Sequence, residues 1–141
     1  MLQTHRRQIT LEQDNNTYRA KPLRKPKALL IDDDRTIRRL VRAKIGDHCD
    51  LLVAGNAHIG ANLFKSEKPD IAFIDIELPD TSGYNLLEWM LNRNKDAFAV
   101  MFSGHSDNEH IWRSVNIGAK GFVAKPFNLQ KMMFFLDNCI A

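Results

Sequence analysis

The sequence predicts an α/β fold in which helices cover both faces of a doubly wound parallel sheet. Five short apolar runs recur along the chain, and each precedes a segment with helical periodicity. The runs are continuous rather than alternating, as expected for strands that are buried on both faces. Strict alternation of strand and helix is typical of a parallel sheet, and 141 residues suit one compact domain.

The five strand–helix pairs follow one another from residue 28 to the end of the chain. The predicted strands are residues 28–31, 51–53, 71–74, 98–102 and 121–124. The predicted helices are approximately residues 35–45, 57–68, 84–93, 107–116 and 129–140. The candidate helix caps are Asp34, Ser106 or Asp107, and Asn128, and the candidate stops are Gly46 and Gly118. Five such units most naturally take the flavodoxin-like (βα)5 arrangement, with strand order 2-1-3-4-5.

Helical periodicity also predicts which side chains face the sheet. These are Ile37, Leu40, Val41 and Ile45 in the first helix, Ile59, Leu63 and Phe64 in the second, and Leu129, Met132, Met133, Leu136 and Ile140 in the last. Phe134 lies outside the last stripe, so it is either partly buried under the final turn or exposed as a partner or dimer contact. Arg38, Arg39 and Arg42 lie opposite the first stripe, where simple solvation and docking of an acidic kinase are both open.

The segment before the first strand differs in composition from the rest. Residues 1–27 carry seven basic residues and only two acidic ones, whereas the remainder is slightly acidic. We expect residues 1–26 to form a basic, solvated and partly disordered arm, with a short helix near residues 9–13 as the alternative. Residues 27–141 then form the globular domain. Because the basic excess belongs to the arm, direct DNA binding is a minor alternative.

Composition also restricts where the protein works. No stretch approaches the roughly 18 apolar residues that a membrane-spanning helix needs. The first eight residues lack the apolar core of a secretion signal. Cys49 and Cys139 have no metal-ligand spacing, and two lone thiols fit a reducing cytoplasm better than a disulfide framework.

Polar residues follow four of the predicted strands. Asp32, Asp33 and Asp34 follow the first strand, and Asp75 follows the third. Ser103 and Lys125 follow the fourth and fifth. Because parallel strands end at the same rim of a sheet, we expect these side chains to form a single site.

Carboxylates that are packed together repel one another, and a hard divalent cation relieves that repulsion. Asp32, Asp33 and Asp75 therefore predict a Mg²⁺ site, whereas Asp34 is expected to cap the following helix. A carboxylate beside Mg²⁺ can act as a nucleophile toward phosphorus. Lys125 and the Ser103 hydroxyl can then stabilise charge on a transferring phosphoryl group.

These segments resemble the receiver domain of response regulators, the phosphoacceptor module of two-component signalling. The matching motifs are Leu30–Asp33, Asp75–Gly83, Met101–Gly104 and Gly121–Phe127, in the order and at the spacing of that family. Each motif is weak alone, and together they are specific. The resemblance covers the chain from about Lys27 to Ala141.

The resemblance implies a role for each residue of the site. Asp75 is the phosphoacceptor, Asp33 binds Mg²⁺ (or Mn²⁺) directly and Asp32 binds it through a water. Glu77 supplies a backbone carbonyl to the metal, and Lys125 pairs with the phosphoryl oxygens. Ser103 is the switch hydroxyl, Phe122 is the aromatic side chain whose rotamer follows it, and the peptide before Pro126 is cis.

The resemblance also implies partners and a signalling route. The donor is a histidine kinase or a histidine phosphotransfer protein, and the output face consists of the fourth helix, fifth strand and fifth helix. A downstream protein or a second copy of the chain would bind that face. We expect a regulator that at most phosphorylates itself from small donors and dephosphorylates itself. Since no output domain follows the last helix, we expect a stand-alone receiver, with a receiver from a longer protein as the alternative.

Four residues depart from the family's commoner pattern, and one enzyme class competes with it. Serine stands at 103 where threonine is commoner, and Gly104 replaces a small alanine, which loosens the loop. The side chains of Glu77 and His105 would alter the lifetime of the phosphoryl group. The competing enzyme class is the aspartate-nucleophile phosphatases. These enzymes carry their D-x-D motif after the first strand, whereas Asp75-Ile76-Glu77 follows the third, which argues against this class.

Overall fold

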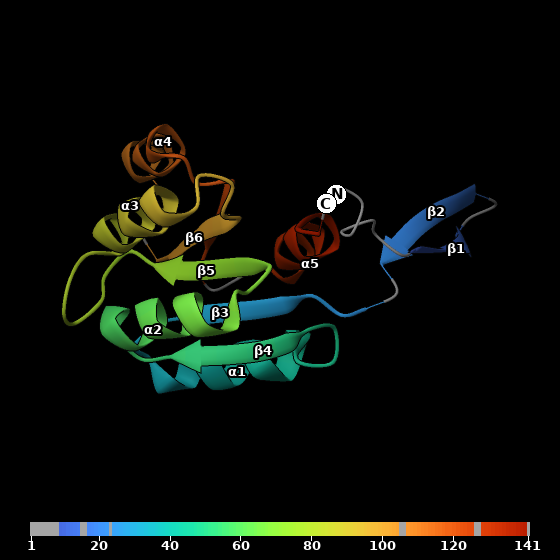
Figure 1. Ribbon diagram of the computed structural model, residues 1–141, viewed down its shortest axis with the longest axis horizontal. Helices are drawn as coiled ribbons and strands as arrows, with labels where there is room; N and C mark the ends of the chain where they lie inside the picture. Colours follow the sequence, from blue (N-terminus) through green and yellow to red (C-terminus); the bar gives the residue numbers. More distant parts are fainter. Residues whose placement is uncertain (1–8, 15–16, 23, 105–106, 126–127, 141) are drawn as a thin grey trace.

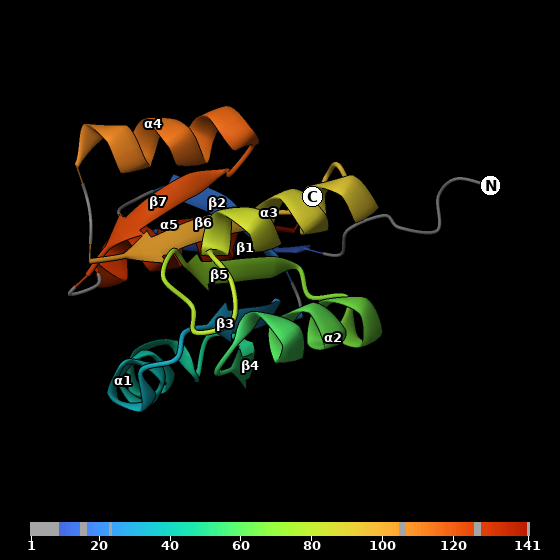
Figure 2. The same ribbon diagram turned by 90° about the vertical axis from the view of Figure 1, so that its left-hand side faces the viewer.

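The computed structural model describes residues 9–14, 17–22, 24–104, 107–125 and 128–140. The main sheet has five strands in the order β4-β3-β5-β6-β7. These are β3 (Lys27–Ile31), β4 (Asp50–Ala54), β5 (Ile71–Asp75), β6 (Ala99–Ser103) and β7 (Gly121–Ala124), and every neighbouring pair is parallel. Numbered within this sheet, the order is 2-1-3-4-5, which confirms the predicted topology (Figure 2).

A helix follows each strand of this sheet. The helices are α1 (Arg35–Ile45), α2 (Ala57–Glu67), α3 (Gly83–Arg93), α4 (Asn108–Ile117) and α5 (Leu129–Asn138). Each begins after a residue whose side chain accepts a backbone N–H of the first turn. These N-caps are Asp34, Asn56, Ser82, Asp107 and Asn128, so the predicted caps Asp34, Asp107 and Asn128 are confirmed. Ser106, the other candidate cap, lies outside the described residues.

Two apolar cores lie on opposite faces of the sheet because successive side chains of a strand alternate between its faces. Leu29 points into the core beneath α2, α3 and α4, whereas Leu30 points into the core beneath α1 and α5. Phe73, Phe102 and Met132 are fully buried in the second core. Figure 1 shows these helices arranged around the sheet. Each such burial contributes about 1.5–3 kcal/mol before the cost of ordering the chain.

The predicted buried stripes are correct at their centres and wrong at their margins. Leu40, Ile59 and Leu129 are 40%, 45% and 38% exposed, although the helical period placed them facing inward. Periodicity gives the direction of a helix face, but the neighbouring elements decide how wide the buried strip is. Phe134 is 60% exposed, whereas the adjacent Phe135 is buried and lies against Gly121.

The N-terminal segment corrects one expectation. Residues 9–13 do not form a helix, because β1 (Ile9–Asp14) pairs antiparallel with β2 (Thr17–Pro22) as a separate two-stranded sheet. In the sequence, apolar and polar residues alternate at Ile9–Glu12 and at Tyr18–Lys21, and this period of two is typical of strands. The hairpin extends past α5 in Figure 1. At its root, the guanidinium of Arg24 donates two hydrogen bonds of 2.9 Å to the Asp70 carboxylate.

Within the described ranges, no helix has the length and apolar character that crossing a bilayer requires. Cys49 and Cys139 are free thiols, and burial raises their pKa values to about 11 and about 12.

Gly83 lies where the loop after β5 enters α3, and its backbone packs closely against the backbone of Asp75. A side-chain carbon at Gly83 would collide with the Asp75 carbonyl, whereas one at Gly104 would have no neighbour within 4 Å. We expect Gly83→Ala to lower the free energy of unfolding by about 1–3 kcal/mol. Gly104→Ala, the matched control, should change it by less than about 1 kcal/mol. Equal urea midpoints for the two variants would contradict this packing.

Candidate functional site

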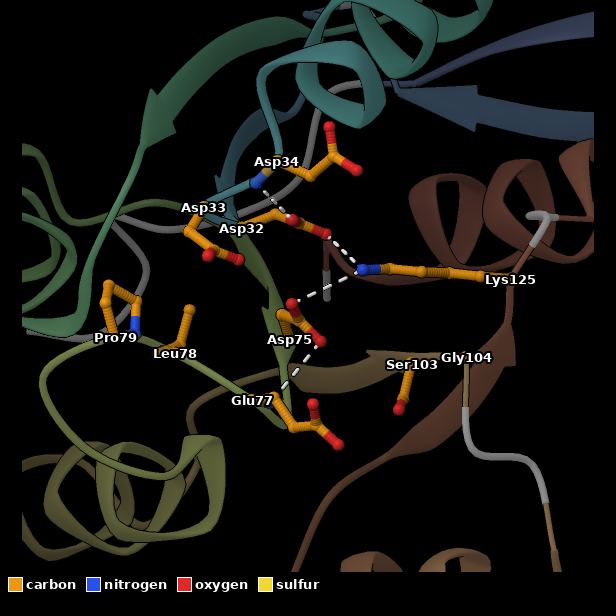
Figure 3. Close-up of a pocket in the computed structure, with 10 residues that line it drawn as sticks. All are labelled: Asp32, Asp33, Asp34, Asp75, Glu77, Leu78, Pro79, Ser103, Gly104 and Lys125. Carbon is orange, nitrogen blue, oxygen red and sulfur yellow. Dashed lines mark hydrogen bonds and ion pairs between the residues drawn. The ribbon is translucent and has the colours of Figure 1, made fainter.

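The carboxyl ends of β3, β5, β6 and β7 converge on one pocket of about 440 Å³. Its lining consists of Asp32, Asp33, Asp34, Asp75, Glu77, Leu78, Pro79, Ser103, Gly104 and Lys125 (Figure 3). The four sequence segments predicted to meet therefore do meet. The reason is topological, because all five strands are parallel and end at the same rim.

Asp32 is the most deeply buried carboxylate of the pocket, with no exposed surface. The Asp34 backbone N–H donates to Asp32 Oδ1 over 2.9 Å, and Lys125 Nζ lies 2.6 Å from Asp32 Oδ2. The Asp32 carbonyl accepts a 2.8 Å hydrogen bond from Arg38 Nη1. The loop after β3 is thus held from both sides, and Arg38 is not a merely solvated residue of α1.

Asp75 lies beside Asp32 and is only 6% exposed. Lys125 Nζ lies 3.3 Å from Asp75 Oδ2, and the Glu77 backbone N–H donates to Asp75 Oδ1 over 3.4 Å. Burial, reinforced by the neighbouring charge of Asp32, raises the pKa of Asp75 to about 6, and Lys125 only partly offsets this. At neutral pH the side chain is therefore mainly ionised, although it is poorly solvated.

Lys125 is the cation that joins the two buried carboxylates. Burial opposes its charge, but the ion pairs with Asp32 and Asp75 outweigh that effect and raise its pKa above the usual value. Its ammonium group also lies 5.1 Å from the centre of the Phe102 ring. Lys125 is therefore charged at neutral pH, and a positive charge at this position is suited to electrostatic stabilisation of a phosphoryl group.

Asp32, Asp33 and Asp75 have the arrangement of a cation site. One ligand oxygen from each lies within 4.8 Å of the other two, and in Figure 3 the three side chains face the same space. Carboxylate oxygens suit a hard divalent ion such as Mg²⁺, which keeps several waters and so needs only partial coverage by protein. Asp34 does not join this group because its side chain caps α1, as predicted.

Of the remaining predicted residues, Ser103 lines the same pocket and Phe122 lies in the adjacent core. Ser103 is 1% exposed, and its carbonyl accepts a 2.8 Å hydrogen bond from the Lys125 backbone N–H. Phe122 is 4% exposed and belongs to the core beneath α4. The ring therefore already occupies an inward position. Pro126 and His105 lie outside the described residues.

Sequence reasoning missed the residue that fixes the rim of the pocket between β5 and α3. Asp80 accepts 2.9 Å hydrogen bonds from the backbone N–H groups of Ala57 and His58, at the first turn of α2. These bonds connect the loop after Asp75 to a helix that begins 23 residues earlier. A cap supplied from so far along the chain leaves no local sequence signal.

The family can now be assigned from comparison with known proteins. The family model described as the response regulator receiver domain matches residues 28–137. The chain belongs to this receiver family. Members of the family are regulators of two-component signalling.

Curated relatives support this assignment and differ in length. The probable C4-dicarboxylate response regulator DctR of Bacillus subtilis is 29% identical over 114 residues, which are 79% of this chain and 50% of that protein. A protein-glutamate methylesterase/protein-glutamine glutaminase of Rhodopseudomonas palustris is 28% identical over 79% of this chain and 29% of its own length. The receiver thus spans half or less of these two relatives, whereas it spans 91% of protein CcdB of B. subtilis at 28% identity.

Solved structures show the same fold. A CheY-like receiver domain from Methanospirillum hungatei superposes with a TM-score of 0.74 at 26% identity, covering 82% of this chain and 97% of that one. The receiver domain of Francisella response regulator 1452 has a TM-score of 0.77 at 22% identity, covering 82% and 97%. The identity of the second supports the fold alone.

The raised pKa of Asp75 has a consequence for stability. An aspartate titrates near 3.9 in an unfolded chain, whereas Asp75 titrates near 6 in the folded protein. The protonated form of Asp75 therefore favours the folded state at low pH, and this stability is lost as pH rises through about 6. We expect Asp75→Asn to raise the free energy of unfolding by about 1–3 kcal/mol at pH 7.5. The gain should shrink as pH falls and vanish near pH 4, as measured by urea unfolding at several pH values.

Asp80→Asn provides a control with the opposite sign. Hydrogen bonds from the backbone N–H groups of Ala57 and His58 lower the pKa of Asp80. Replacing this carboxylate by an amide should therefore not stabilise the receiver at pH 7.5. An Asp75→Asn protein no more stable than wild type at pH 7.5 would contradict the electrostatic description of the site.

The metal site is testable by comparing two adjacent aspartates. Asp33→Asn removes a proposed ligand oxygen, whereas Asp34→Asn retains a side chain that caps α1 equally well. At Mg²⁺ ten times above its dissociation constant, wild type should gain about 1.4 kcal/mol of stability. We expect thermal shift titrations to show this gain in Asp34→Asn and an at least tenfold weaker Mg²⁺ affinity in Asp33→Asn, which leaves a gain of about 0.4 kcal/mol or less at the same Mg²⁺ concentration. Similar Mg²⁺ responses in the two variants would exclude Asp33 as a ligand.

Proposed function

We propose that this receiver accepts a phosphoryl group on Asp75 from a phosphohistidine of a histidine kinase or histidine phosphotransfer protein. The observation that carries the proposal is the contact of one lysine with two buried carboxylates, Asp32 and Asp75, at the rim of the sheet. Asp75 supplies an ionisable oxygen, and Lys125 supplies a fixed positive charge beside it.

The transfer follows from the chemistry of these groups. An Asp75 carboxylate oxygen attacks phosphorus, the P–N bond of the phosphohistidine breaks, and its electron pair returns to the imidazole. Lys125 and the Ser103 hydroxyl bind the phosphoryl oxygens as their charge develops. Asp33 and the Glu77 carbonyl would hold Mg²⁺ (or Mn²⁺) directly, and Asp32 would hold it through a water. When bound, the ion neutralises phosphoryl charge.

The first helix suggests how the donor docks. Five residues of α1 are basic and none is acidic. A hollow of about 160 Å³ beside the pocket is lined by Arg35, Arg38, Arg39, Arg42 and Val53. We propose that this surface attracts an acidic patch of the kinase or phosphotransfer protein, which raises the rate of association more than the final affinity.

The output surface is the one formed by α4, β7 and α5. Trp112 and Val115 on α4 are 68% and 56% exposed, and Phe134 on α5 is 60% exposed. Apolar side chains left in solvent on this scale are suited to contact with a downstream protein or a second receiver. Phosphorylation adds about −1.5 to −2 charges near Ser103, whose loop leads into α4.

The rest of the proposal concerns organisation and place. Residues 1–26 form a basic arm that contains the hairpin, and residues 27–141 form the receiver, which acts in the cytoplasm as a regulator rather than a metabolic enzyme. Its own chemistry is limited to self-phosphorylation from small phosphodonors and self-dephosphorylation. DNA binding by the arm is not needed for this function.

The test is intact-mass analysis after incubation with acetyl phosphate and Mg²⁺. We expect one added phosphoryl group in wild type and none in Asp75→Ala, because Asp75 is the proposed acceptor and contacts both Lys125 Nζ and the Glu77 backbone N–H. Lys125→Met should retain the acceptor but slow its modification by at least about tenfold.

A matched phosphohistidine donor gives the second arm of the experiment. Phosphorylation of Asp75→Ala to the same extent as wild type would exclude Asp75 as the acceptor. A wild-type chain that accepts nothing from either donor would overturn the proposed function.

A further inference from the structure

A buried polar contact joins α3 to α4 outside the phosphoacceptor pocket. Tyr84 is 3% exposed, and its hydroxyl lies 2.7 Å from His110 Nδ1. The two rings are nearly parallel, with an interplanar angle of 4°, and the Arg113 guanidinium lies 4.1 Å from the centre of the Tyr84 ring. Burial raises the pKa of Tyr84 above its usual value, so the hydroxyl keeps its proton at neutral pH.

The α4 side of this contact is itself fixed. Ser114 has no exposed surface, and its hydroxyl donates a 2.8 Å hydrogen bond to the His110 carbonyl. His110, Arg113 and Ser114 therefore face α3 together, while Trp112 and Val115 face solvent on the same helix. A shift or rotation of α4 large enough to change the exposed face must disturb the Tyr84 contacts.

The α3 side leads directly back to the phosphoacceptor. Gly83 precedes Tyr84, and its N–H donates a 2.6 Å hydrogen bond to the Ile76 carbonyl, one residue after Asp75. There is no room for a side chain between Gly83 and the Asp75 backbone. The position of the Tyr84 ring is thus set by the same loop that carries the acceptor, so it cannot follow α4 freely.

We propose that Tyr84 and His110 are positioning residues. Their contact holds α4 in the position that it has in this structure, and so opposes the conformational change that phosphorylation of Asp75 would cause. The inference rests on the proposed phosphoacceptor function. In the described arrangement Lys125 contacts the free carboxylate of Asp75, at a position that a phosphoryl group would take over. Ser103, the last residue of β6, lines the pocket, and α4 is the next element along the chain. Movement of Ser103 toward that group therefore tends to displace α4, and the Tyr84–His110 contact resists this displacement.

Reciprocal coupling gives the direction of the effect. If the contact favours the carboxylate arrangement, its removal must favour binding of a phosphoryl analogue at Asp75 by the same factor. Loss of one hydrogen bond corresponds to about a three- to tenfold change in that equilibrium. A residue that only stabilised the fold would not alter the affinity of the pocket.

The experiment compares two tyrosine variants, because the chain contains only Tyr18 and Tyr84. Tyr84→Phe removes the hydroxyl and keeps the ring, and Tyr18→Phe makes the same chemical change in β2. Beryllofluoride is a suitable probe, since a receiver domain of similar fold, DrrB, has been described in a form activated by BeF3. Its binding with Mg²⁺ is measured by fluorine NMR, and folding is checked by thermal unfolding.

We expect Tyr84→Phe and His110→Ala to bind beryllofluoride about three- to tenfold more tightly than wild type, with Tyr18→Phe unchanged. A folded Tyr84→Phe protein with wild-type affinity would overturn the coupling while leaving the phosphoacceptor proposal intact. Weaker binding by Tyr84→Phe would also overturn it, because the contact would then favour the switched state. Wild-type protein that binds no beryllofluoride would overturn the proposed function and, with it, this inference.

Discussion

One lysine placed between two buried carboxylates organises the functional end of this receiver. Lys125 lies 2.6 Å from Asp32 and 3.3 Å from Asp75, at the ends of three different strands. Two aspartates that are almost fully buried would repel each other without a cation. The pair of contacts therefore lets the sheet keep both charges at its rim, where a phosphoryl group and a hard metal ion can be bound.

Under the proposed function, a chain of contacts connects Asp75 to the surface of α4. Asp75 is fixed from behind by the turn at Gly83, and the loops after β5 and β6 lead into α3 and α4. Asp80 connects the first of these loops to α2. Tyr84 connects α3 to α4. Because these contacts are discrete and the interior is closely packed, α4 is better suited to two arrangements than to gradual movement.

The basic cluster and the most exposed apolar side chains lie on different helices of the receiver. Basic side chains gather on α1, next to the pocket, whereas the exposed apolar side chains of α4 and α5 include Trp112 and Phe134. Charge accelerates a transient encounter, and apolar area stabilises a longer-lived complex. A phosphodonor that binds transiently would use the basic surface of α1. A partner that binds the phosphorylated state would use the apolar surface of α4 and α5.

Sequence patterns were enough to predict the five strand–helix units, their order in the sheet and the convergence of Asp32, Asp33, Asp75, Ser103 and Lys125. Short apolar runs, helical periodicity and parallel topology are local or general properties, so they can be inferred without coordinates. Which margins of the helices are buried depends on how the neighbouring elements pack in the folded protein, as Leu40 and Ile59 show. The tertiary structure also revealed the distant hydrogen bonds of Asp80 and the Tyr84–His110 contact. Such features depend on which elements become neighbours after folding, so no spacing within one segment encodes them.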